Sequence, residues 1–95
     1  MNGRSLTLSV SPVGELIRQL GSGSAEARLG AVETLHGMMD AGTLRLEAAD
    51  AFTMRGYLMQ AMEKDGRCVA KGQALLGFAD RVLEEWLSSV PMIEM

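Results

Sequence analysis

The sequence holds one histidine, His36, and one cysteine, Cys68, and these are the side chains best suited to act as a general base or a nucleophile. Either role needs converging neighbours that tune the pKa of the reacting group. His36 falls on the apolar side of an expected helix, as core and interface histidines do, and Cys68 has the character of a small buried hydrophobe. A disulfide within the chain and a zinc site built on a cysteine pair are excluded, so any metal site would rest on carboxylates.

The other polar residues form no catalytic pattern. Glu84 and Glu85 are a plain pair on the surface of an expected helix, and the remaining carboxylates are spread over solvated helix faces. The glycine-rich stretch GSGS at 21–24 lacks the lysine and the spacing of a phosphate-binding loop. We therefore expect a non-enzymatic protein with no cofactor, no metal and no small-molecule ligand.

The residue types that stand out are those suited to contact with another protein. Eight methionines accompany four aromatic residues, and methionine is frequent on surfaces that adapt to partners, although it also fills irregular cores. Arg55 could form a bidentate pair with a partner carboxylate, or lay its stem over apolar groups with its head in water. The candidate contact residues are Met38, Met39, Met54, Arg55, Tyr57, Met59 and Met62.

Composition and charge limit the classes of partner. Apolar residues make up 47% of the chain, enough for a real but modest core, and the net charge is −3 with scattered basic residues. A nucleic-acid surface would show clustered lysine and arginine, so no nucleic-acid partner is expected. No stretch reaches 18 consecutive apolar residues, so no membrane span is expected and the protein is predicted to be cytoplasmic.

These residues must be positioned by helices. Apolar spacing and end signals predict helices over 12–20, 24–41, 47–64 and 68–89, within a single helical domain over 1–95. Ser11 and Ser24 are the expected N-caps, and Gly42 is the expected end of the second helix. In the fourth helix, the seam 68-72-75-79-82-86 predicts the spine of the core. The fold class is therefore all-α, a small bundle of three to four helices.

The N-terminal stretch SLTLSV has a different period. Leu6, Leu8 and Val10 alternate with small polar residues, which predicts an extended arm or a minor β-strand over 1–10. The only other alternating segment is TLRL at 43–46. The arm could pair with it in a small ribbon, form an irregular extended segment, pair with a strand of another chain, or be disordered.

Glycines inside the expected helices suggest a plastic domain. Gly30, Thr34 and Gly37 line one small-residue face of the second helix, where another backbone could approach closely; alternatively they are tolerated surface positions.

Together these features favour a small acidic protein-binding module, acting as an inhibitor, an anti-activator or a secretion-type chaperone. It would cover an apolar surface of its partner, with acidic groups guiding the approach. One alternative is a structural or accessory subunit in which the same apolar face closes a homodimer. A less favoured one is a DNA-binding regulator with a helix–turn–helix in its third and fourth helices.

Overall fold

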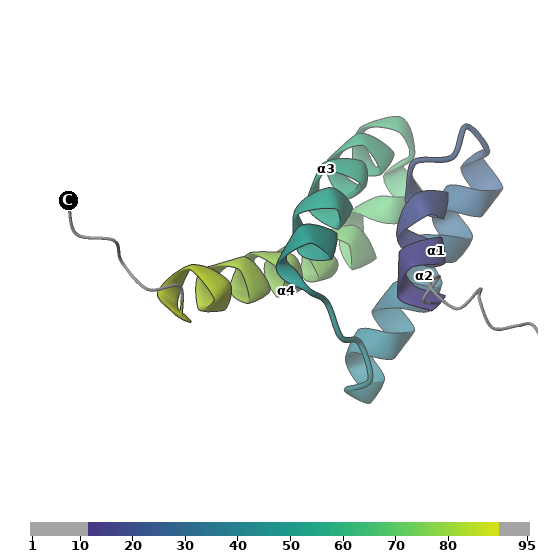
Figure 1. The fold of residues 1–95 in the computed structure, drawn as a ribbon. Helices are drawn as coiled ribbons and strands as arrows, with labels where there is room; N and C mark the ends of the chain where they lie inside the picture. The colour runs from purple at the N-terminus through teal and green to yellow at the C-terminus, as the bar shows by residue number, and fades with distance from the viewer. Residues whose placement is uncertain (1–11, 90–95) are drawn as a thin grey trace, which may run out of the picture.

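A computed structural model describes residues 12–89, and every regular element in that range is helical (Figure 1). The elements are α1 (Pro12–Leu20), α2 (Ala25–Ala41), α3 (Ala48–Lys64), the 3-10 turn η2 (Gly66–Cys68) and α4 (Val69–Ser89). The expected α-helix boundaries agree with these to within one residue, and the 3-10 turn before α4 is additional. The fold is the small all-α bundle that the sequence predicts.

The residues flanking α2 fix its two ends. The hydroxyl oxygen of Ser24 accepts a hydrogen bond from the Ala27 N–H at 3.2 Å, which satisfies one of the free donors of the first turn. At the other end Gly42 adopts the left-handed conformation with φ 77°, and its N–H donates to the Met39 carbonyl oxygen at 3.1 Å. Both caps confirm the sequence prediction; the expected cap Ser11 lies outside the described residues.

The core forms where all four α-helices meet. Its largest fully buried side chains are Leu20, Val32, Leu35, Met54, Leu58, Cys68 and Leu75. α3 and α4 form an antiparallel hairpin joined through η2, while α1 and α2 pack against one half of that hairpin (Figure 1). The C-terminal part of α4 extends away from the core, whereas the start of α3 still contributes the buried Ala51 and Met54 to it (Figure 1).

α3 and α4 approach each other closely at Gly72. A Cβ atom at this position would lie 2.9 Å from the Cγ and Sδ atoms of Met62. Because glycine has no such atom, the two helices can pack at this distance near the closed end of the hairpin.

The apolar face of α4 is buried only along its first half, which corrects the expectation that the whole seam forms the core spine. Along that seam Cys68, Gly72, Leu75 and Ala79 are buried, Val82 is partly buried and Trp86 is exposed. In Figure 1 the C-terminal part of α4 runs beyond α1 and α2, so neither of these helices covers this face there.

The TLRL segment is a loop and not a strand. Residues 43–47 link α2 to α3, and the N–H and hydroxyl of Thr43 both donate to the Met38 carbonyl oxygen, at 2.9 and 3.2 Å. Leu44 is buried in the core. The other expected strand residues, Leu6, Leu8 and Val10, lie outside the described residues.

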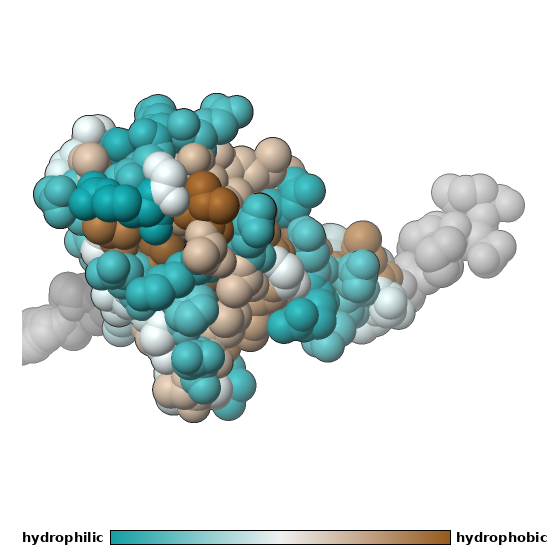
Figure 2. Space-filling model, turned by 180° about the vertical axis from the view of Figure 1, so that it is seen from behind, coloured by the Kyte–Doolittle hydropathy of each residue, from teal (hydrophilic) through white to brown (hydrophobic). Residues whose placement is uncertain are grey.

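The surface mixes apolar and hydrophilic residues. Seen from behind, a band of apolar residues lies between hydrophilic ones (Figure 2). In Figure 2, apolar residues also lie on the projecting C-terminal part of α4. None of the helices described over 12–89 is both long enough and apolar enough to cross a membrane. The helical bundle thus leaves apolar surface uncovered, and α3 and α4 carry the large exposed apolar side chains of the described residues.

Candidate protein-binding surface

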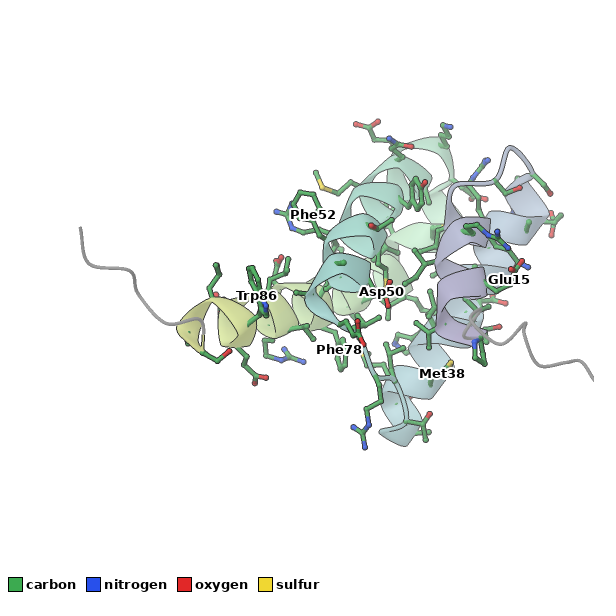
Figure 3. All side chains as sticks on the ribbon, in the orientation of Figure 1. Glu15, Met38, Asp50, Phe52, Phe78 and Trp86 are labelled. Atoms are coloured by element: carbon green, nitrogen blue, oxygen red, sulfur yellow. The ribbon has the colours of Figure 1, made fainter. Side chains whose placement is uncertain are left out.

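The candidate contact residues from the sequence do not gather on one surface. Met54 is fully buried, so its side chain belongs to the core in this conformation. Met38, Met39, Tyr57 and Met62 are partly buried and pack against the core. Figure 3 shows Met38 on α2, well apart from the outer ends of α3 and α4. Only Met59 and Arg55 are exposed.

The large exposed apolar side chains lie on α3 and α4. In the described part of the chain these are Phe52 (70% exposed), Leu87 (64%), Trp86 (50%) and Met59 (48%). Figure 3 shows Phe52 and Trp86 on the same outer side of the hairpin. Residues scattered singly over a surface need no explanation, but these four follow one pair of helices.

A groove runs along the outer face of this pair. We define the α3–α4 groove as the face formed by Phe52, Arg55, Met59 and Met62 of α3 with Val69, Gln73, Leu76, Asp80, Leu83 and Leu87 of α4. It consists of two adjoining hollows of ≈ 420 and ≈ 430 Å³. The spacing of three and four residues along each helix places all these positions on one face.

An ion pair crosses the groove at its middle. The Nε of Arg55 lies 2.9 Å from the Oδ1 of Asp80, and the two side chains are 45% and 52% exposed. An exposed pair of this kind contributes only about 0–1 kcal/mol to stability. Both residues line both hollows, so the pair divides the groove into two apolar sections. The sequence singled out Arg55 as an interface candidate but did not predict Asp80 as its partner.

A hollow at the open end of the hairpin is lined by apolar side chains. Ala48, Ala49, Phe52, Leu83 and Trp86 line a hollow of ≈ 340 Å³ that adjoins the groove through Phe52 and Leu83. No charged side chain lines it. The sequence predicted Trp86 for the core because its spacing continues the buried seam. Trp86 is exposed because α4 extends beyond α1 and α2, and this extension depends on how the helices pack together.

Carboxylates border these hollows. Glu63 and Glu84 line the α3–α4 groove, and Glu47 and Glu85 line the hollow on the other side of the open end. None of the four takes part in an ion pair within residues 12–89, whereas Asp80 is paired with Arg55. The border of the apolar surface therefore carries carboxylates that form no ion pair within the described residues.

A second cluster of charges holds the other side of the bundle together. Arg67 pairs with Asp65 through its Nη2 at 2.8 Å and with Glu26 at 3.5 Å, which links η2 to the start of α2. Hydrogen bonds from the Arg67 side chain and backbone lower the pKa of Asp65 from 3.8 to about 2. The same pairing raises the pKa of Arg67. The charges of this cluster are therefore explained by their contacts between η2 and α2.

Arg28 is a buried residue that the sequence reading missed. It is only 8% exposed, and its Nη1 donates to the Ser22 carbonyl oxygen at 2.8 Å. Its Nε atom is buried without a hydrogen-bond partner in the described structure. The buried residues of α2 are Arg28, Ala31, Val32 and Leu35, whereas Leu29 is partly buried. Arg28 thereby ties α2 to the turn that precedes it.

The two candidates for a catalytic role, Cys68 and His36, are buried or partly buried. Cys68 is fully buried in η2, and that burial raises the pKa of its thiol, so the unreactive protonated form is favoured. His36 is half-buried on α2. Within residues 12–89 no three His, Cys, Asp or Glu side chains are grouped closely enough to hold a metal ion.

The α3–α4 groove and the open end of the hairpin are thus the surfaces best suited to contact another molecule. Comparison with known proteins adds no relative: no family model, no curated protein and no solved structure matches this chain.

Proposed function

We propose that this chain is a non-enzymatic protein-binding module that covers an apolar surface of another protein with its α3–α4 groove and the open end of the hairpin. In this role it would act as an inhibitor, an anti-activator or a secretion-type chaperone. Of the contact residues expected from the sequence, Arg55, Met59 and Met62 belong to this surface, joined by Phe52, Trp86 and Leu87.

The observation that supports the proposal is the exposure of Phe52, Trp86 and Leu87 next to one another. Burying a side chain of this size is worth roughly 1.5–3 kcal/mol, and association costs at least about 4 kcal/mol in lost freedom of motion. Because these three side chains and Met59 are only 48–70% exposed, their burial supplies part of that value each and together offsets the lower end of the cost. Aromatic residues are also enriched at the centres of protein interfaces.

The mechanism would be occlusion. A groove between two antiparallel helices can receive an apolar stripe of a partner and withdraw it from other contacts. The unpaired carboxylates Glu63 and Glu84 at its border would guide a partner of opposite charge and raise the rate of association.

Site-specific photo-crosslinking in lysate of the source cells tests this proposal. A photoreactive phenylalanine analogue replaces Phe52 or Leu87, and the control carries the same analogue in place of Glu33, which is exposed on α2. We expect discrete crosslinked species from positions 52 and 87 and none from position 33.

The masses of the crosslinked species separate the alternatives. A product of twice the chain mass would favour the homodimeric subunit, in which the same face pairs with itself. The same diffuse products from all three positions would overturn the proposal that this surface binds a protein.

A further inference from the structure

The α3–α4 groove has the geometry of a receptor for one helix. Its α3 residues are Phe52, Arg55, Met59 and Met62, at spacings of three, four and three residues. Its α4 residues continue the same alternation from Val69 to Leu87. Two antiparallel helices with such facing stripes leave room for a third helix, whose own apolar side chains then repeat at three and four residues.

The charges along the groove are ordered as well. The Arg55–Asp80 pair shows which positions of the two helices lie at the same level. Glu84 lies four residues beyond Asp80 toward the open end, and Glu63 lies eight residues beyond Arg55 toward the closed end. Twelve helical residues at 1.5 Å each place the two unpaired carboxylates about 18 Å apart along the groove axis.

We propose that the α3–α4 groove binds a single amphipathic helix of another protein that carries a Lys or Arg near each end of its apolar stripe, about 18 Å apart. This inference deepens the proposed function and rests on it. The two cations would face Glu63 and Glu84, and the apolar stripe would pack on Phe52, Met59 and Leu87.

The middle of the bound helix has a different requirement. A bulky apolar side chain over the Arg55–Asp80 pair would remove both charges from water. The free-energy cost of this desolvation exceeds the stabilisation that the ion pair contributes. The partner helix therefore carries a small or polar residue at its centre, between two apolar clusters.

Charge argues against a second copy of this chain as the occupant. A two-fold symmetric contact sets the same patch against itself, so the unpaired carboxylates of one groove border would meet those of the other. The cations nearest in sequence, Lys64 and Arg81, line neither hollow of the groove. Like charges brought together across an interface disfavour that contact.

Peptide titration of the full-length protein tests the occupant. Three designed helical peptides share one apolar stripe with a central serine and differ only in their end residues, which are lysine, glutamine or glutamate. Trp86 is the only tryptophan of the chain and lines the hollow that adjoins the groove, so its emission reports on a ligand that reaches the open end, with calorimetry as a second readout.

We expect the lysine-ended peptide to bind about tenfold more tightly than the glutamate-ended one at low salt, because two attractive pairs replace two repulsive ones. This ratio should shrink at high salt. It should also fall toward one in the Glu63→Gln/Glu84→Gln variant. The matched control Glu33→Gln/Asp40→Asn changes the net charge equally on α2 and should keep the ratio.

Each contrary result has a separate meaning. Equal affinity of the three peptides, or an equal loss of the ratio in the control variant, overturns the basic-helix occupant. If no peptide binds while crosslinks from positions 52 and 87 persist, the groove covers a partner that is not such a helix, and only the further inference fails. A concentration-dependent doubling of mass in light scattering would replace it by a second copy of this chain.

Discussion

Met54 and Met59 are five residues apart on α3, yet the first is fully buried and the second is 48% exposed. Both fall within the broad apolar arc of α3, and periodicity alone cannot say which part of such an arc faces the core. The distinction depends on where α1 and α4 pack, which is a property of the assembled bundle.

Substitution of these two methionines should separate their roles. Met54→Ala should lower the free energy of unfolding by about 2–5 kcal/mol because it leaves a cavity. Met59→Ala should change it by less than about 0.5 kcal/mol, as exposed substitutions do. Urea denaturation followed by circular dichroism measures both, and similar losses would show that Met59 is also part of the core.

Asp65 should make stability depend on pH in the acid range. Its pKa is about 2 in the folded protein against an ordinary value of 3.8, so folding favours the charged form. The resulting stabilisation is present above the ordinary value and is lost as the pH falls toward 2. We expect Asp65→Asn to be less stable than the unsubstituted protein at pH 5, with the difference closing near pH 2. A difference that stays constant with pH would contradict this account.

At the scale of the helices, local chemistry determined the boundaries, and the sequence was sufficient to predict them. Ser24 and Gly42 act through bonds to residues a few positions away, so their roles can be recognised without knowing the fold. The extent of burial along α4 is different, because it depends on where α1 and α2 end. The buried seam stops after Ala79 for that reason, and Trp86 could not be assigned from spacing.

The glycines of α2 give a second test at this scale. A Cβ atom at Gly30 or Gly37 would meet nothing within 4 Å, so neither glycine permits a close approach within the described structure. Gly30→Ala and Gly37→Ala should each stabilise the protein by roughly 0.5–1 kcal/mol. Gly21→Ala is the matched control, since its Cβ would lie 2.9 Å from the Tyr57 ring, and it should be destabilising. Thermal melts by circular dichroism would show these opposite signs.

At the scale of the whole molecule, the all-α fold followed from the sequence, but the location of the uncovered surface did not. The sequence placed the contact residues between Met38 and Met62, mainly because methionine is common there. The structure instead brings the start of α3 beside the end of α4, about thirty residues later in the chain. A single sequence carries no direct signal for such a pairing of distant segments.

The uncovered surface should contribute little to folding. The double variant Phe52→Ser/Leu87→Ser should keep its free energy of unfolding within about 1 kcal/mol, since each exposed change costs at most about 0.5 kcal/mol. It should bind less of a hydrophobic fluorescent dye, because two of the largest exposed apolar groups are gone. Leu58→Ser, in the core, should unfold the protein instead. A large loss of stability in the double variant would mean that this surface is needed for the fold.

Because Cys68 is buried, the rate of its reaction with a thiol reagent can report local opening of the structure. This only thiol is fully buried in η2, at the closed end of the hairpin, and lies outside the α3–α4 groove. A thiol reagent can therefore react only when that corner opens, and the labelling rate measures the frequency of opening. A ligand that occupies the groove would slow this reaction without touching the sulfur, since it stabilises the closed hairpin. The decrease in the labelling rate of Cys68 would then report the fraction of protein that has bound ligand, even when the ligand carries no chromophore.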